Sequence, residues 1–302
     1  MESRISRKTG EKMEKVRQLI GCDCAYKKRI YGSGVGIAIL DSGVSKHLDL
    51  QGRVKVFQDY VKGRQQPYDD NSHGTHIAGI ICGSGGCSKG RFMGVAPLSH
   101  LIICKVLNEK GDGDIQSVLQ ALEWIVENAK AYRIRIINVS VGASPREEDR
   151  EERKLLDMVE YAWSQGFVVV AAAGNNGPDS GSVTTPGISR KIITVGTFDG
   201  ETIKRKEYSG RGPTDTCVMK PEIISPGNEI VSCYGKNAYK KMSGTSMATP
   251  VVSGAIALLL EKNPNMTPKD VKYCLYKTAK DCGYSKRVQG WGLIDVKRMM
   301  EY

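Results

Sequence analysis

Short apolar runs alternate with helical patterns along most of the 302-residue chain. Apolar residues recur at helical spacing from Ile115 to Val126, and Asp114 is the expected N-cap of this helix. The short runs are rich in β-branched residues and predict buried strands over residues 35–40, 100–106, 134–141, 167–172 and 191–196. Strands that alternate with helices favour an α/β fold with a mostly parallel central sheet and helices on both faces.

Three further helices are predicted in the second half of the chain. A charged helix over residues 150–165 joins two of the predicted strands. A second helix carries Pro250 near its start and runs to about residue 262, and a third begins with Thr267 as N-cap and Pro268 as its first residue. Because no repeat or low-complexity linker divides the chain, we expect a single domain over residues 21–302, preceded by a basic N-terminal arm over residues 1–20.

Composition and charge exclude some classes of protein. The longest apolar run is Phe167 to Ala173, far shorter than the ~18–20 residues that a transmembrane helix needs. The chain has 44 Lys and Arg against 33 Asp and Glu, a formal net charge of +11. This charge permits acidic partners, but the simpler interpretation is a basic solvated surface, and we expect neither a nucleic-acid nor a membrane partner.

The cysteine content and the N-terminal residues indicate the cellular compartment of the protein. There are nine, an odd number, and no Cys-x-x-Cys pairs repeat at a metal-binding spacing, so we expect no zinc site. Residues 1–20 are charged throughout and lack the apolar stretch of a secretory signal. We therefore expect free thiols and a cytoplasmic location.

Three separated segments hold candidate catalytic groups. Asp41 ends a predicted strand, where open parallel sheets bind ligands, although an Asp there is also a common turn or cap residue. His73 and His76 lie three residues apart, which suits proton transfer by one of them better than metal binding, because the zinc-protease spacing and its Glu are missing. Ser246 stands at the start of an apolar helix, where free N–H groups can stabilise an anion or where the Ser is simply an N-cap.

Taken together, these segments resemble the subtilisin family of serine endopeptidases, from about Gly21 to the C-terminus. The Asp, His, Ser order along the chain is the order of this family. Four motifs carry the resemblance in family order: residues 41–43 (DSG), 73–76 (HGTH), 173–177 (AGNNG) and 244–250 (GTSMATP). Weaker matches support them at residues 94–97 (GVAP), 220–223 (KPEI), 225–227 (SPG) and 290–294 (GWGLI).

The resemblance implies a role for each matching residue. Ser246 would be the nucleophile, His73 the general base, Asp41 the group that orients the imidazole, and Asn175 an oxyanion-hole donor. His76 matches a structural position and receives no catalytic role. A protein or peptide substrate would bind as an extended strand between two backbone edges, with Thr184 near the wall of the specificity pocket. The residues of these two edges are Gly111, Asp112, Gly113, Ser140, Val141 and Gly142.

Metals and cofactors are not required for this chemistry. The family's usual calcium loop corresponds here to residues 82–91, which are Gly-rich, basic and free of carboxylates, although Asp49 matches a carboxylate used at that site. We therefore expect the usual calcium site to be absent, and calcium at a weaker site built from backbone carbonyls stays open.

The length of the chain narrows the biological roles that we expect. The motifs extend over nearly the whole chain and leave no room for a folding pro-domain, so the chain is more similar to intracellular or processing members of the family. We expect a serine endopeptidase of intracellular protein turnover or dedicated processing. The alternative is a pseudoprotease that binds a peptide or partner, which is disfavoured because all four catalytic positions are filled.

Overall fold

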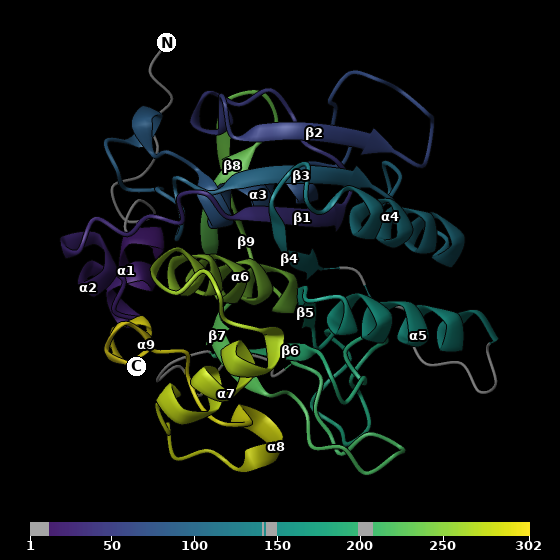
Figure 1. Ribbon diagram of the computed structural model, residues 1–302, viewed down its shortest axis with the longest axis vertical. Coiled ribbons are helices and arrows are strands. Elements are labelled where there is room, and N and C mark those ends of the chain that lie inside the picture. Colours follow the sequence, from purple (N-terminus) through teal and green to yellow (C-terminus); the bar gives the residue numbers. More distant parts are fainter. Residues whose placement is uncertain (1–11, 141, 143–149, 199–207) are drawn as a thin grey trace.

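The computed structural model describes residues 12–140, 142, 150–198 and 208–302, and its centre is a parallel sheet of seven strands (Figure 1). Their order is β2-β3-β1-β4-β5-β6-β7. An antiparallel hairpin of β8 and β9 forms a second, smaller sheet. The bounds are β1 Gly36–Asp41, β2 Val54–Asp59, β3 His100–Lys105, β4 Ile134–Val139, β5 Val168–Ala172, β6 Ile193–Phe198, β7 Ile223–Pro226, β8 Ile230–Tyr234 and β9 Ala238–Met242.

The central strands are buried on nearly every residue. All six residues of β1 and all five of β5 are buried, as parallel strands covered on both faces require. Five predicted strands are confirmed to within a few residues, as β1, β3, β4, β5 and β6. The edge strands β2 and β7 and the hairpin β8–β9 were not predicted.

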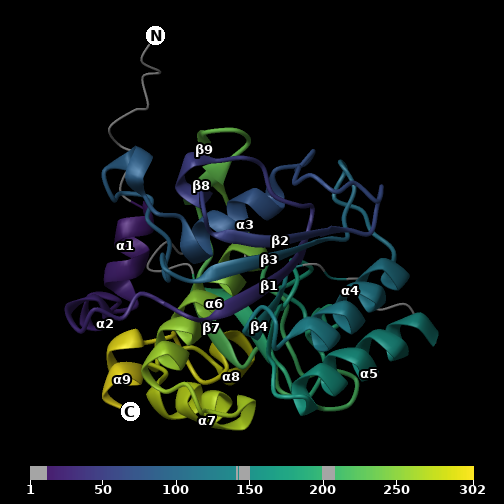
Figure 2. The same ribbon diagram turned by 45° about the horizontal axis from the view of Figure 1, so that its top comes forward.

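Two pairs of helices cover the sheet (Figures 1 and 2). The pair α3 (His73–Cys82) and α6 (Thr245–Lys262) packs on one face, and the pair α4 (Ile115–Asn128) and α5 (Arg150–Ser164) on the other. Because α6 is apolar on nearly all sides, it runs through the core and contacts β4 to β7. The single α/β domain that the pattern predicted is therefore observed.

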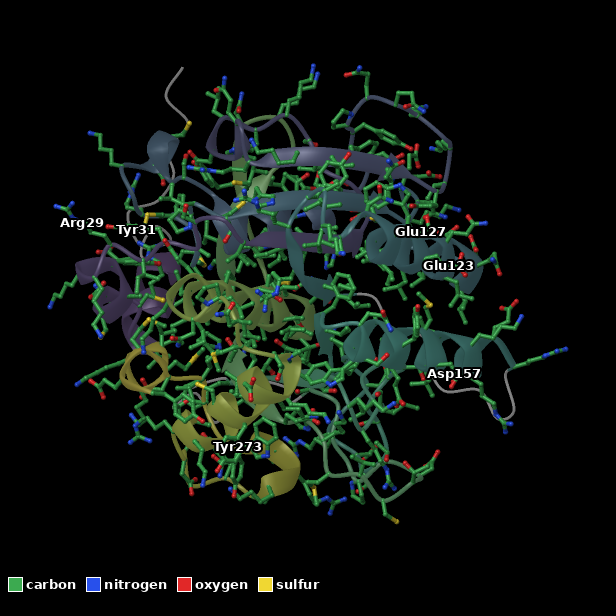
Figure 3. The ribbon with its side chains drawn as sticks, viewed as in Figure 1. Arg29, Tyr31, Glu123, Glu127, Asp157 and Tyr273 are labelled. Carbon is green, nitrogen blue, oxygen red and sulfur yellow. The ribbon has the colours of Figure 1, made fainter. Side chains whose placement is uncertain are left out.

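The outer helices are amphipathic. Glu123 and Glu127 on α4 and Asp157 on α5 point to solvent (Figure 3). Leu122 and Val159 on the same helices are buried. The side chain of Asp114 caps α4 by accepting from the Ser117 N–H at 2.7 Å, as predicted. Thr267 and Asp270 form a capping box at the start of α7 (Pro268–Thr278). None of the helices in the described ranges is long and apolar enough to cross a membrane.

The N-terminal segment corrects one expectation. The basic arm was expected over residues 1–20, of which residues 1–11 lie outside the described residues. In the rest, Lys12–Leu19 forms helix α1, and Met13, Val16 and Ile20 are buried in the core. The Arg17 guanidinium donates to the carbonyl oxygens of Gly90 and Met93, which ties α1 to a distant loop. Helix α1 is therefore packed on the domain through Met13, Val16 and Ile20, whereas Leu19 is exposed. The remaining elements are α2 Asp23–Lys27, η1 Leu48–Leu50, η2 Gly86–Ser88, α8 Lys286–Gln289 and α9 Val296–Glu301.

Candidate active site

A hollow of about 510 Å³ lies where β3 and β4 end and where α3 and α6 begin. Ligands bind at the carboxyl ends of strands in open parallel sheets, so the fold itself favours this location. His73 from α3 and Ser246 from α6 line the same hollow, although 172 residues separate them in the sequence. The other lining residues are Asn71, Leu107, Lys110, Gly111, Asp112, Gly113, Asp114, Ile115, Val118, Ser140, Gly142, Leu155 and Thr185.

Asp41 and His73 form a hydrogen-bonded pair. Asp41 is the last residue of β1 and is fully buried, whereas the His73 side chain is 21% exposed. The His73 Nδ1 lies 2.8 Å from Oδ1 and 3.0 Å from Oδ2 of Asp41. An ionised carboxylate only accepts, so Nδ1 carries the hydrogen, and in the neutral ring Nε2 is then free to accept a proton.

The electrostatics of this pair favour the protonated ring. Burial lowers the pKa of His73, but the charge of Asp41, the hydrogen bond to its carboxylate and the charge of Asp69 together raise it more. The pKa of His73 therefore lies above its ordinary value of 6.5. The pair stabilises an imidazolium, which is the form that a general base takes after it accepts a proton.

Asp69 holds the start of α3 in place. Its Oδ1 accepts from Ser42 Oγ at 2.9 Å and from the Ser72 N–H at 2.7 Å. Its Oδ2 accepts from the N–H and the hydroxyl of Thr75 at 2.9 and 2.6 Å. These bonds join the turn after Asp41 to the helix that carries His73. The sequence analysis missed this residue, although an Asp three positions before a Ser at a helix start is a pattern typical of side-chain-capped turns.

Lys105 is a second positioning residue that the sequence analysis missed. It ends β3, its side chain is fully buried, and its Nζ donates to the carbonyl oxygens of Ser42 and Leu107 at 2.6 and 2.7 Å. The same Nζ pairs with Asp70 Oδ1 at 2.7 Å. Because three acceptors surround it, the buried charge is compensated, and the turn that follows Asp41 is fixed.

Ser246 lies in the first turn of α6. Gly244 precedes the helix with φ at +156°, a conformation that favours glycine. The hydroxyl of Ser246 donates to the carbonyl oxygen of Ser140 at 3.2 Å, so it is held at the rim of the hollow rather than against His73. The first N–H groups of a helix lack intrahelical acceptors, which leaves the Ser246 N–H available to a ligand.

Asn175 is oriented by the residue before Ser246. Its Oδ1 accepts from the N–H of Thr245 at 3.0 Å and from the Thr245 hydroxyl at 3.1 Å. With its oxygen engaged, Asn175 presents its amide NH₂ as the donor. No role was predicted for Thr245, because its role depends on a contact with Asn175, which lies 70 positions away in the sequence.

The predicted substrate residues fall into three groups. Five of them line the hollow, namely Gly111, Asp112, Gly113, Ser140 and Gly142, while Val141 lies outside the described residues. Thr184 is buried behind the lining, where its Oγ1 lies 2.5 Å from the position that a Cβ on Gly142 would take. The neighbouring Thr185 lines the hollow instead. Any side chain at position 142 would therefore collide with Thr184.

His76 occupies a structural position. It is fully buried on α3, and its Nε2 faces the carbonyl oxygens of Ile230 and Lys240 at 3.1 and 3.0 Å. Burial lowers the pKa of His76 to about 4, so the ring is neutral at pH 7. His76 thus joins α3 to the hairpin β8–β9 and lies outside the hollow.

Comparison with known proteins agrees with this geometry. The model of the subtilase peptidase family, Peptidase_S8, matches residues 32–292. The chain belongs to the subtilase family. The serine protease AprX of Bacillus subtilis (strain 168) is 41% identical over 268 residues, which cover 81% of this chain and 61% of AprX. The chain thus spans about three fifths of that relative's length.

Other subtilases match over most of their length. Subtilisin Savinase of Lederbergia lenta is 35% identical over 273 residues, which cover 90% of this chain and 93% of Savinase. The structure of Sphericase superposes with a TM-score of 0.76 at 31% identity and covers 89% of this chain and 96% of Sphericase. A cold-adapted subtilisin-like serine proteinase gives a TM-score of 0.75 at 29% identity.

The calcium position expected from the family can be tested against Asp49. The carboxylate of Asp49 accepts from Ser84 Oγ at 3.1 Å, from the Cys87 N–H at 3.0 Å and from Tyr239 OH at 2.5 Å. Calcium needs six to eight oxygen ligands, whereas the loop directs N–H and O–H donors at this carboxylate. The residues around Asp49 therefore do not fit a calcium ion.

Proposed function

We propose that this subtilase is a serine endopeptidase that hydrolyses peptide bonds through an acyl-enzyme. The observation that carries the proposal is that the hydrogen-bonded pair of Asp41 and His73 meets Ser246 in one hollow. A nucleophile, a base and a group that orients the base are the parts that acyl transfer needs. We infer no metal or organic cofactor in this chemistry.

The first step uses His73 as the base. The Ser246 hydroxyl turns from the Ser140 carbonyl toward His73 Nε2, gives up its proton and forms a bond to the substrate carbonyl carbon. Catalytic hydrogen bonds are often loose before substrate binds, so the observed contact with Ser140 suits a resting state. Asp41 accepts from Nδ1 and stabilises the imidazolium that results.

The oxyanion of the tetrahedral intermediate needs hydrogen-bond donors. The Asn175 amide and the Ser246 N–H supply them, and the bond from Thr245 keeps the amide oriented. The C–N bond then breaks, and His73 returns its proton to the leaving amine. A water molecule, deprotonated by His73, finally hydrolyses the acyl-enzyme and releases Ser246.

The shape of the hollow favours an extended protein or peptide substrate. Residues 111–113 and, from another segment, Ser140 and Gly142 line the hollow, and a strand laid between these two segments would gain main-chain hydrogen bonds. Apolar side chains cover part of the floor and suit an apolar substrate side chain; they are Leu107, Ile115, Val118 and Leu155. We propose that the enzyme works in a reducing cytoplasm, in protein turnover or processing, which its nine free cysteines support.

The proposal is tested by protein hydrolysis. The full chain is incubated with a denatured protein substrate, beside the Ser246→Ala variant as the matched control. We expect cleavage by the wild type and a loss of about 10⁴-fold or more in the variant. If the folded wild type cleaved no faster than Ser246→Ala, the chain would instead be a peptide-binding pseudoprotease.

A further inference from the structure

A surface groove lies at the edge of the sheet that faces away from the candidate active site. It consists of two hollows of about 420 and 580 Å³ that share Trp163, Lys191 and Lys269 in their linings. Two of the lining residues, Gly166 and Lys191, each stand two positions before a strand, β5 and β6 respectively. The active-site hollow lies where parallel strands end, so this second groove is at the opposite edge of the same sheet. We call it the basic groove, formed by the end of α5, the segment before β6 and helix α7.

Every charged side chain in the lining of the basic groove is a cation. They are Arg190, Lys191, Lys269 and Lys272, and no aspartate or glutamate of the described residues lines either hollow. Lys277 stands beside them, also on α7. The basic groove therefore gathers part of the net charge of +11 in one place and attracts anionic groups.

Ion pairs behind the groove do not cancel this charge. Lys191 pairs with Glu160 at 3.0 Å, and Lys272 pairs with Glu222 at 3.1 Å. Glu222 also pairs with the buried Lys220 at 2.7 Å, so two carboxylates stand against three amines. An excess of positive charge remains at the groove.

The other cations are available to a ligand. Lys269 is exposed, and no carboxylate of the described residues pairs with it. Its neighbour Asp270 turns to the N–H and hydroxyl of Thr267 in the capping box instead. Arg190 is exposed as well, and its guanidinium, which has five N–H donors, donates to the carbonyl oxygen of Thr216. Donors for carboxylates thus remain at both ends of the groove.

Aromatic rings form the apolar walls of the basic groove. Tyr273 and Tyr276 are each 52% exposed and lie one turn apart on α7, where Figure 3 labels Tyr273. The Tyr276 ring meets Trp291 edge-on, with 5.7 Å between the ring centres. Exposed tyrosines beside cations are typical of protein-binding surfaces. A ligand that fits this groove therefore has apolar groups as well as negative charge.

The state of the rings favours a peptide over a single-stranded nucleic acid. Bases need free ring faces on which to stack. Trp163 is only 7% exposed, and the Lys272 amine lies 5.7 Å from its ring centre. The Lys277 amine covers one face of each tyrosine, at 5.2 and 5.5 Å. Peptide carboxylates can pair with these amines, while aliphatic side chains pack on ring edges and lysine stems.

We propose that the basic groove is a docking site for an acidic segment of a partner protein, in which glutamates or aspartates alternate with apolar residues. The carboxylates would pair with Lys269 and Arg190, and the apolar side chains would lie against Tyr273 and Tyr276. Because the groove and Ser246 are at opposite edges of the sheet, a protein that is held there leaves the active site open. Docking needs no bond cleavage, so the proposal is independent of the proposed function.

Peptide binding tests the groove directly. The full chain with Ser246→Ala, which prevents cleavage of the probe, is titrated into a fluorescein-labelled peptide in which pairs of glutamates alternate with single leucines. We expect fluorescence anisotropy to show saturable binding of one peptide per chain, weaker at high salt. Lys269→Glu should raise Kd about tenfold or more, because it places a like charge against the peptide. Tyr273→Ala should also raise Kd, through the loss of apolar contact.

A matched variant separates the groove from the overall charge. Lys236→Glu makes the same change of charge at an exposed lysine in the turn between β8 and β9, and it should leave Kd within about twofold. The same peptide with glutamine in place of glutamate should not bind, because it has no charge to pair. An equal rise in Kd in the Lys236 and Lys269 variants would contradict a defined site.

Further results would overturn the proposal. One is the absence of saturable binding to the folded chain, and another is an unchanged Kd in Lys269→Glu. If circular dichroism showed that Lys269→Glu does not fold, Lys269→Gln would decide, and its unaltered Kd would equally contradict the site. A single-stranded oligonucleotide that bound more tightly than the peptide, with binding lost in the Lys269 variant, would assign the groove to nucleic acid instead.

Discussion

Two histidine–aspartate pairs have their aspartate at the end of β1 or shortly after it, and they differ in what the carboxylate faces. In the first pair, both oxygens of Asp41 point at Nδ1 of His73. In the second, the carboxylate of Asp49 turns away to Ser84, Cys87 and Tyr239, and only its backbone N–H meets His47.

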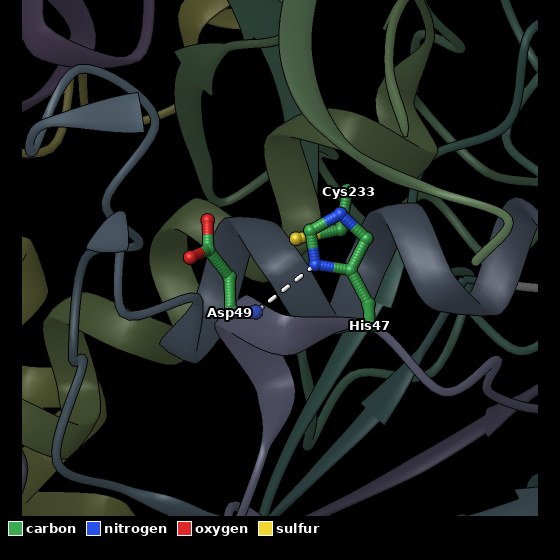
Figure 4. Close-up of side chains that lie close together, drawn as sticks. All are labelled: His47, Asp49 and Cys233. Carbon is green, nitrogen blue, oxygen red and sulfur yellow. Dashed lines mark hydrogen bonds between the residues drawn. The ribbon is translucent and has the colours of Figure 1, made fainter. Parts of the chain in front are cut away.

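The protonation states follow from this difference. Burial lowers the pKa of His73, but the Asp41 charge, its hydrogen bond and the Asp69 charge together raise it more, whereas burial prevails and lowers the pKa of His47. A ring that can become charged suits proton transfer, whereas the His47 ring bonds the Asp49 N–H (Figure 4) and the Ala238 carbonyl and suits a structural role. The comparison shows that an aspartate near a histidine decides little until the orientation of its carboxylate is known.

Replacing each of the two aspartates by asparagine should give the largest difference between the two pairs. We expect Asp41→Asn to lower kcat by about 10⁴-fold, because the amide cannot stabilise the imidazolium and favours the wrong tautomer. Asp49→Asn should lower Tm, with a change in kcat below about tenfold for the folded protein, since it acts on packing. Peptide hydrolysis measures kcat, and thermal unfolding measures Tm. Equal losses of kcat in the two variants would contradict the distinction between the two aspartates.

Removing the oxyanion donor has the next largest effect. We expect Asn175→Ala to lower kcat by about 10²–10³-fold with KM little altered, because the amide bonds an oxygen whose charge develops only in the transition state. Asn176→Ala is the neighbouring control and should alter kcat far less. A change confined to KM would show that Asn175 only binds the ground state.

The pH profile reports the first pair directly. Catalysis needs neutral His73, and the pKa of His73 lies above 6.5, so kcat/KM should fall as the pH drops through a value above 6.5. The same raised pKa gives stability that is present below the unfolded value and lost as the pH rises through the folded value. An acid limb below 6.5 would contradict the assignment.

Asp69 should give the smallest effect. Its charge contributes to the raised pKa of His73, so Asp69→Asn should move the acid limb of kcat/KM toward lower pH. One carboxylate oxygen becomes an NH₂ group, which cannot accept from the N–H of Ser72 or Thr75, so the variant also loses hydrogen bonding at the start of α3. An acid limb that moved upward would mean that Asp69 acts only through geometry.

Much of the fold followed from the periodicity of the sequence. The buried strands β1, β3, β4, β5 and β6 carry continuous apolar runs, and α4 to α7 carry a helical period or strong caps. Three of the missed strands lack these signals: β2 is half-buried, β7 has only four residues, and β9 carries two exposed lysines. Their pairing depends on tertiary contacts that no local pattern records.

The roles in the candidate site were predicted through the resemblance of four motifs to the subtilisin family. Residue type and position alone placed Asp41 at the end of a buried strand and Ser246 at the start of a helix, where each could also be a cap. Asp69, Lys105 and Thr245 act through hydrogen bonds to remote backbone atoms, which spacing does not reveal.

The central claim is that the hydrogen-bonded pair of Asp41 and His73 activates Ser246. A fluorophosphonate probe, which reacts with activated serines, is added to the full chain, and the labelled peptide is identified by mass spectrometry. We predict labelling of Ser246 in the wild type, its loss in Ser246→Ala and a much slower rate in Asp41→Asn. A folded wild type without label, or with label on another serine, would contradict the account.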